Sequence, residues 1–177
     1  MGDCPKLSMQ ITNRANVIPS SMAGGQGLSA GDSSNASLVR SWIEDVLLAR
    51  QDGKTLRMDY VRRRAPEYWA ADYMAHDDPA LGGREGIIMK LERLSRMCSD
   101  IQIEILSLYA KNDMVANSFR VTATQSEPNG PLSTAMQMSW VQNEVLRIRD
   151  GRIAEGWATK DWLASLQKIG AISLRRR

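Results

Sequence analysis

The sequence predicts an α+β fold in a single domain, with a curved antiparallel sheet that carries helices on one face. Apolar residues recur with a period of 3.6 as far as residue 99, and they alternate with a period of two beyond it. Turn-forming residues separate the alternating segments, as expected for consecutive antiparallel strands. The chain of 177 residues is long enough for one domain of ordinary size.

Composition narrows the chemistry that is available. Apolar residues make up 43% of the chain and charged residues 24%, as in a typical globular protein. The only histidine is His76, and the two cysteines, Cys4 and Cys98, lie far apart in the sequence. These counts exclude a cysteine-rich zinc site, an iron–sulfur cluster and a disulfide framework, so we expect no metal. Acid–base chemistry then falls to carboxylates, tyrosines, lysines, arginines or His76.

Charge and hydropathy give no sign of a nucleic-acid or membrane partner. The net charge of +3 equals that of the last three residues, Arg175, Arg176 and Arg177. The run of arginines at residues 62–64 is read as a solvated charge run rather than a binding face. No apolar segment has the length of a membrane span, and no apolar stretch near the N-terminus resembles a secretory signal. We therefore expect a cytoplasmic protein.

The chain is predicted to divide into a leader, a domain and a tail. Ten of the eighteen residues from 20 to 37 are glycine or serine, which is too little apolar surface to offset the ordering entropy. Residues 1–37 are therefore interpreted as a flexible leader, or as an arm that orders only against a partner subunit. The domain spans residues 38–171, and residues 172–177 form a basic tail.

Three helices are expected before residue 99. The first follows an apolar stripe that starts at Leu38 and ends near Leu47, with N-cap candidates at Ser34, Asn35 and Ser37. The second spans about residues 54–64. A loop at residues 65–83 follows, and it contains an aromatic cluster and His76. The third helix starts near Arg84.

Four strands and a last helix complete the prediction. The strands span residues 101–110, 114–126, 134–149 and 152–159, with turns at 111–113 and 127–131. Asp150 and Gly151 form a strong hairpin signal between the last two strands. A final helix at residues 161–169 ends at Gly170.

Two stretches resemble a known family. They are DYMAHDDPALGGREG at residues 72–86 and VLRIRDGRIAEGWATKDWLASLQKIGA at residues 145–171. Both resemble segments of SnoaL-like polyketide cyclases, and the resemblance extends over residues 38–171. It implies the nuclear transport factor 2-like fold, in which a cone of curved sheet and helices encloses a deep, mostly apolar pocket. Family members close polyketide rings by aldol condensation without metal or organic cofactor, and relatives isomerise, dehydrate or hydrolyse small molecules or lack activity.

The residues that the family uses for this chemistry are only partly present. By its spacing from the family motif, the position of the family's general-base aspartate falls on Ala158. The position of its histidine falls on Glu144, and its second aspartate corresponds to Asp161. The resemblance therefore does not transfer the known aldol mechanism to this chain.

Glu144 is the candidate general base or acid. It shares the even positions of its strand with Gln142 and with apolar residues, so both side chains are predicted to lie on the buried face. A buried carboxyl group has a raised pKa, which suits proton transfer near neutral pH. A position at the rim of the sheet, or an ion pair with Arg120, would be a structural alternative.

Three further polar residues are candidates. His76 lies where family members carry a histidine near the pocket mouth, but it could equally be a loop histidine bonded to the backbone. Arg120 could hold a developing oxyanion, or it could pair with Glu144 or Glu104. Asp161 could line the pocket or cap the last helix.

The substrate is expected to contact aromatic, sulfur-containing and small residues of the pocket wall. The same residues could be ordinary core, and the small ones would widen the pocket. The candidates are Trp42, Tyr73, Met74, Trp140, Gln142, Trp157 and Ala158.

Together these observations predict a small cofactor-independent enzyme that acts on a hydrophobic carbonyl compound, such as a polyketide or another secondary metabolite. Acid/base proton transfer would lead to cyclisation, isomerisation or elimination. The alternative is a non-catalytic ligand-binding or assembly module, which Ala158 favours. An epoxide hydrolase is disfavoured for the same reason. A homodimer is expected through the outer face of the sheet.

Overall fold

The computed structural model describes residues 29–48, 50–51, 55–126, 136–161 and 163. Its helices are α1 (Ala30–Ser41), α2 (Met58–Tyr68) and α3 (Gly83–Met97), with a π-helical segment η1 (Trp42–Leu47) and a 3₁₀ turn η2 (Pro79–Leu81). Two short strands, β1 (Arg50–Gln51) and β2 (Thr55–Leu56), pair with each other. The main strands are β3 (Trp69–Ala75), β4 (Cys98–Lys111), β5 (Met114–Gln125), β6 (Gln137–Arg149) and β7 (Arg152–Lys160).

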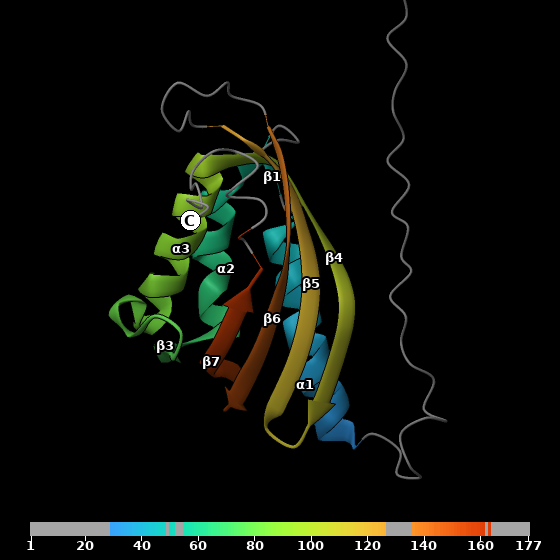
Figure 1. Ribbon diagram of the computed structural model, residues 1–177. Helices are drawn as coiled ribbons and strands as arrows, with labels where there is room; N and C mark the ends of the chain where they lie inside the picture. Colours follow the sequence, from blue (N-terminus) through green and yellow to red (C-terminus); the bar gives the residue numbers. More distant parts are fainter. Residues whose placement is uncertain (1–28, 49, 52–54, 127–135, 162, 164–177) are drawn as a thin grey trace, which may run out of the picture.

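The main sheet has five strands in the order β3-β7-β6-β5-β4. Strands β4 to β7 form the predicted antiparallel meander, and β3 adds to its edge by parallel pairing with β7. Figure 1 shows α2 and α3 side by side, with the long strands curving around the helical layer. The predicted α+β class is confirmed.

Strand β3 corrects the predicted loop at residues 65–83. Its buried positions do not alternate regularly, because Trp69 and Ala70 are both buried and the pairing with β7 shifts register between Trp69 and Met74. A period of two is therefore not visible in this segment. The same region also holds the end of α2, whose residues 58–68 lie four positions later than the predicted helix.

Helix α1 begins at Ala30, eight residues before the predicted start at Leu38. Its N-cap is Ser29, which was not among the predicted caps. The Ser29 hydroxyl accepts from the Asp32 amide at 3.0 Å, and Asp32 Oδ2 accepts from the Ser29 amide at 3.2 Å. Asp32 is buried and its Oδ1 accepts from the amide of Asn112, at 2.7 Å, in the β4–β5 turn. This tertiary anchor outweighs the weak helix propensity of the glycine and serine residues, so residues 30–37 of the predicted leader are helical.

The two strand connections that the structure describes follow the sequence signals. Asn112 has φ of 56° in the β4–β5 turn. Asp150 and Gly151 have φ of 51° and 68°, which are the left-handed values that a tight hairpin between β6 and β7 requires. The predicted turn at residues 127–131 and most of the predicted last helix lie outside the described residues.

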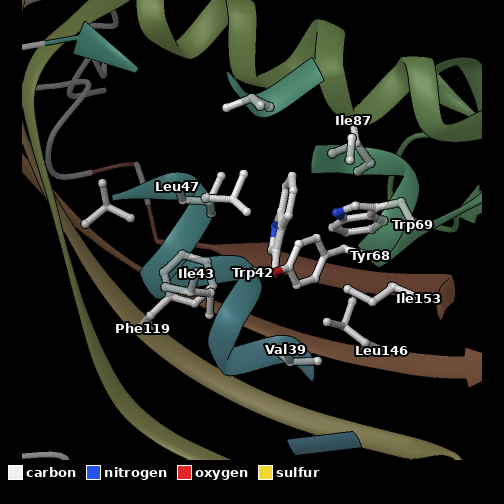
Figure 2. Packing of buried hydrophobic residues seen from close by; sticks show 14 of the residues in the cluster. Val39, Trp42, Ile43, Leu47, Tyr68, Trp69, Ile87, Phe119, Leu146 and Ile153 are labelled. Atoms are coloured by element: carbon white, nitrogen blue, oxygen red, sulfur yellow. The ribbon is translucent and has the colours of Figure 1, made fainter. Parts of the chain in front are cut away.

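The core fills the space between the helical layer and the inner face of the sheet. Figure 2 shows Val39 of α1, and Trp42 and Ile43 of η1, close to Phe119 and Leu146 of the sheet. Along β6 the buried residues are Met138, Trp140, Leu146 and Ile148, so the predicted even parity is confirmed. No helix in the described part of the chain is long and apolar enough to cross a membrane.

Candidate active site

An interior cavity of about 360 Å³ lies between the helices and the inner face of the sheet. This volume is within the range of sites that bind small organic molecules. Aromatic and aliphatic side chains from both layers form most of the wall, among them Trp42, Trp69, Phe119, Trp140 and Leu146. Figure 2 shows Trp42, Tyr68 and Trp69 gathered in this region. The wall is therefore suited to an apolar ligand.

Glu144 and Gln142 are the polar side chains that β6 contributes to this wall. Gln142 Nε2 donates a hydrogen bond to Glu144 Oε1. Asn117 on β5 lies directly across from Glu144, and its Nδ2 donates to Glu144 Oε2 at 3.4 Å. Two amides therefore hold the carboxyl group in one orientation.

The environment of Glu144 makes it a stronger base than an exposed glutamate. Burial raises the pKa of its carboxyl group from the ordinary value of 4.5, and the charge of Asp77 adds to the rise. The hydrogen bonds from Gln142 and Asn117 and the charge of Lys160 oppose it without cancelling it. The side chain can therefore take up and release a proton closer to neutral pH.

Asn117 is a site residue that the sequence analysis missed. It is 4% exposed and stands between Val115 and Phe119 on the buried face of β5. Its Oδ1 has no hydrogen-bond partner among the described residues. A polar amide at an odd position of an otherwise apolar alternation was the signal that could have identified it. Because an amide carries both a donor and an acceptor, Asn117 can serve either protonation state of Glu144.

Tyr73 and Ala158, both predicted to contact substrate, also line the cavity. Tyr73 is 5% exposed and lies on β3. Ala158 lies on β7. The other predicted wall residues that border the cavity are Trp42, Trp140, Gln142 and Trp157. Met74 does not line it, because this residue is 52% exposed and the strand alternation turns it away.

His76 points to the other side of β7. Its ring stacks on Trp157 with centroids 4.2 Å apart and planes 4° from parallel. Its Nε2 lies 3.0 Å from Glu155 Oε2, and Glu155 Oε1 accepts from Arg147 at 2.8 Å. The His76 amide also donates to the Gly156 carbonyl. These contacts hold His76 in a second hollow, which Asn117 and Glu144 also border, and His76 does not line the interior cavity.

Arg120 and Asp161 are not brought to the cavity. Arg120 is exposed on the outer face of β5 and donates to Glu104 Oε2 at 2.6 Å. The alternative pairing with Glu104 is therefore the one observed, and the pairing with Glu144 is wrong. Asp161 is exposed, and its amide donates to the Val141 carbonyl at 3.0 Å.

Charged residues gather where α3, η2 and β7 border the cavity. Lys90 Nζ lies 3.4 Å from Asp77 Oδ2, and Lys160 and Asp78 also line the wall. Burial and the neighbouring Lys90 lower the pKa of Lys160, while Glu144 and the two aspartates oppose that change. Among the described residues, no group of three or more histidine, cysteine, aspartate and glutamate side chains is placed to hold a metal ion.

Comparison with protein families gives one match. The profile of the SnoaL-like polyketide cyclase family matches residues 49–169. No curated protein matches the chain.

Solved structures share the fold at low sequence identity. A candidate SnoaL-like polyketide cyclase from Jannaschia sp. CCS1 superposes with a TM-score of 0.68 at 20% identity, covering 84% of this chain and 100% of its own. TsrD from Streptomyces laurentii gives a TM-score of 0.61 at 19% identity and coverages of 82% and 100%. A protein of ketosteroid isomerase-like fold from Catenulispora acidiphila, solved in complex with trimethylamine, gives 0.54 at 18% identity and coverages of 75% and 92%. The predicted cone-shaped fold is confirmed.

Proposed function

The chain belongs to the SnoaL-like polyketide cyclase family, and from this premise we propose that it catalyses proton transfer on a small hydrophobic carbonyl compound. The observation that carries the proposal is the position of Glu144. Its carboxyl group is the one that β6 presents to an apolar cavity, and burial raises its pKa. Such a group is poised to remove a weakly acidic proton.

The reaction begins with the substrate's carbonyl group in the cavity and a neighbouring C–H bond facing Glu144. The carboxylate takes the proton from the carbon, the C–H electron pair forms the new carbon–carbon double bond, and the carbonyl oxygen becomes an enolate. Return of the proton from Glu144 to a different carbon completes an isomerisation. Attack of the enolate carbon on a second carbonyl completes a ring closure, and the proton then goes to the new alkoxide.

The cavity wall supports a substrate with a hydrophobic ring system. Trp42, Trp69 and Trp140 border the cavity together with aliphatic residues of α3 and the sheet. Apolar surface of this kind favours burial of rings over flexible polar chains. A polyketide or a related secondary metabolite has this character and carries carbonyl groups beside acidic C–H bonds.

Exchange of hydrogen for deuterium tests the proposal without knowledge of the natural substrate. A panel of bicyclic ketones, led by 2-tetralone, is incubated with the full chain in D₂O, and loss of the proton signal beside the carbonyl is followed by NMR. We expect the protein to accelerate exchange, Glu144→Gln to abolish the acceleration and Arg120→Ala to retain it. The proposal fails if no ketone exchanges faster, or if Glu144→Gln exchanges as fast as the unaltered protein.

Ala158 favours a second candidate, a non-catalytic ligand-binding module of the same fold. A methyl group stands where the family places its general base, so the interior could hold a ligand without transforming it. Native mass spectrometry of the purified protein separates the two candidates when it is combined with the exchange assay. A bound small molecule that leaves on denaturation, with no exchange activity on any ketone, would support the binding module.

A further inference from the structure

The proposed reaction needs a group that stabilises negative charge on the carbonyl oxygen as Glu144 removes the proton. Among the candidate residues from the sequence, His76 and Arg120 are the ones that could donate a hydrogen bond to this oxygen. Both lie on the outer side of the sheet, where His76 contacts Glu155 and Trp157, and Arg120 contacts Glu104. The interior cavity therefore requires another donor.

Tyr73 is held rigidly in the cavity wall. Its ring meets Trp69 edge-on, with centroids 4.7 Å apart and planes at 88°. Trp69 in turn meets Trp42 edge-on, with centroids 5.4 Å apart and planes at 77°. Contacts of this geometry are favourable and fix the ring orientation. The phenol is thus positioned in advance, which is the property that charge stabilisation in a reaction requires.

The hydroxyl of Tyr73 occupies space that only glycine leaves open at position 156. A Cβ atom on Gly156 would lie 2.3 Å from the Tyr73 oxygen and 3.3 Å from Cζ. The backbone at Gly156 does not adopt the left-handed conformation, so glycine is required there by the close approach and not by its own torsion angles. Pairing of β3 with β7 brings these two residues together.

This hydroxyl makes no hydrogen bond to any residue that the structure describes. Tyr73 lines the cavity, and its hydroxyl is not one of the sealed polar atoms of the core, so this donor is available to a ligand in the cavity. Burial, and then the charges of Glu144 and Asp77, raise the pKa of Tyr73 above its ordinary value. The phenol therefore stays protonated, as a donor, across the neutral pH range.

The register of the sheet sets the spacing between the two groups. Ala158 lies directly across from Glu144, and Gly156 is the next residue of β7 on the same face. Diagonal neighbours of this kind are about 7 Å apart in an antiparallel pair. The carboxyl group of Glu144 and the hydroxyl over Gly156 thus flank a space suited to a carbonyl group and its adjacent carbon.

We propose that Tyr73 is a catalytic residue that donates a hydrogen bond to the enolate oxygen while Glu144 holds the abstracted proton. This inference rests on the proposed function. The Tyr73 O–H bond stays intact, the negative charge develops on the substrate oxygen, and the proton on Glu144 returns to carbon or to the new alkoxide. Gly156 is a positioning residue, because its lack of a side chain admits the hydroxyl.

The first experiment compares Tyr73→Phe with the unaltered protein in the 2-tetralone exchange assay. Loss of a donor to a developing oxyanion lowers rates by roughly 100-fold or more, and we expect a fall of that size. Phenylalanine keeps the ring and its contacts with Trp69, so the melting temperature serves as the control for folding. The exchange activity should fall at low pH with the same midpoint as in the unaltered protein, because this fall reports the protonation of Glu144. An unchanged exchange rate in a folded Tyr73→Phe protein would overturn the inference while leaving the proposed function intact.

A second experiment needs no turnover. The probe is 2-naphthol, whose anion resembles an enolate and whose protonated and ionised forms differ in fluorescence. Its affinity is measured for the Glu144→Gln protein and for the double variant that also carries Tyr73→Phe. Both proteins carry glutamine at position 144, so that no buried carboxylate at this position repels the anion. Loss of the Tyr73 donor should weaken binding roughly tenfold or more, since hydrogen bonds to charged groups are the strong ones. Equal affinity in the two proteins would contradict the role of Tyr73, even if no ketone exchanges.

Gly156→Ala provides a matched variant that keeps the tyrosine but displaces its hydroxyl. We expect it to reduce exchange nearly as much as Tyr73→Phe does. Arg120→Ala, on the outer face of the sheet, is the control and should exchange as fast as the unaltered protein. If Gly156→Ala folds, retains full exchange and binds 2-naphthol normally, the close approach has no functional role.

Discussion

Ala158 is the cross-strand partner of Glu144, so a side chain at position 158 projects from the same face of the sheet into the same cavity. An aspartate introduced at position 158, where the resemblance places the family's general base, would therefore lie beside the carboxyl group that the chain already has. Two like charges at this spacing disfavour simultaneous ionisation.

The first prediction concerns Ala158→Asp. We expect the second carboxyl group to raise the pKa of Glu144 further, so that the low-pH limb of exchange activity moves to higher pH. Carboxyl carbon chemical shifts of ¹³C-labelled protein, titrated by NMR, measure this directly. Ala158→Asn adds the same bulk without the charge and should leave the midpoint near that of the unaltered protein. A midpoint that moves equally in both variants would attribute the effect to size.

The second prediction is a dependence of stability on pH. Since burial raises the pKa of Glu144 in the folded protein, its protonated form is favoured there. Below the ordinary value of 4.5, both the folded and unfolded states carry the proton; above it the unfolded chain ionises first, so the free energy of unfolding falls as pH rises toward the raised pKa. Glu144→Gln removes this decline and should therefore gain stability relative to the unaltered protein as pH rises above the ordinary value of 4.5.

Urea unfolding at a series of pH values measures that difference. Glu104→Gln, on the outer face of the sheet, is the matched control and should show no such gain. A constant difference between Glu144→Gln and the unaltered protein at all pH values would mean that Glu144 does not carry a raised pKa in the folded state.

The third prediction concerns the anchor of α1. Burial pushes the pKa of Asp32 upward, but hydrogen bonds from Ser29 and Asn112 and the charge of Lys111 together lower it below the ordinary value of 3.8. A lowered pKa stabilises the fold above 3.8, and that contribution is lost as pH falls through the lowered value. Asp32→Asn should therefore be less stable than the unaltered protein at neutral pH, and the difference should shrink in acid.

Ser29→Ala removes only the cap of the same helix. It should cost about 1 kcal/mol in the free energy of unfolding. Its effect should depend less on pH than the effect of Asp32→Asn does, because the backbone hydrogen bonds from Ser29 and Asn112 and the charge of Lys111 still lower the pKa of Asp32. Thermal unfolding followed by circular dichroism compares the two, and equal pH profiles would contradict the assigned role of the Asp32 charge.

The fourth prediction is that Arg120→Ala is nearly silent. Its ion pair with Glu104 lies on the surface, with side chains 45% and 56% exposed. Exposed pairs of this kind contribute little, so we expect a change within about 0.5 kcal/mol in stability and no change in ketone exchange. A large loss of exchange in Arg120→Ala would contradict this assignment, because a residue on the outer face of the sheet would then take part in the reaction.

The fifth prediction concerns association. We propose that two copies pair through the outer face, where a hollow of about 500 Å³ is bordered by Tyr109 and Val145, which are 48% and 39% exposed. Val145→Asp should then yield a monomer that is still folded, because an unpaired charge would be buried between the copies. Light scattering on eluted protein measures the mass. If the unaltered protein has the mass of a monomer, the proposal is refuted.

The inward position of Glu144 could be predicted because the buried apolar residues of β6, among them Trp140 and Leu146, fall on even positions on both sides of it. Inward even positions alternate with outward odd positions along this strand. Gln142 and Glu144 occupy even positions, so the alternation alone predicts that they face the interior. The same reasoning applied to β5 assigns Arg120 to the outer face, because Phe119 and Val121 flank it on the buried face. The expectation that Arg120 faces the pocket did not follow from this alternation.

The rest of the site depends on contacts between distant segments. Tyr73 and Gly156 meet because β3 pairs with β7, and neither local period nor composition carries that pairing. The stacking of His76 on Trp157 has the same origin, and it turns the histidine away from the cavity. Helix α1 likewise starts early because Asp32 bonds to Asn112, which lies 80 residues away.

The edge position of β3 has a consequence for the order in which the molecule is made. Its strand partner in the main sheet is β7, the last described strand, so Tyr73 cannot take its place over Gly156 until β7 has left the ribosome. Contacts that join such distant segments form late, because the intervening chain must first be ordered. Helices and the β4–β6 meander can assemble before β7 is available, whereas the cavity closes only when β7 joins the sheet. We therefore expect refolding to show a phase in which the sheet has formed but Trp69 and Tyr73 are not yet packed, and in which the protein is unable to bind its ligand.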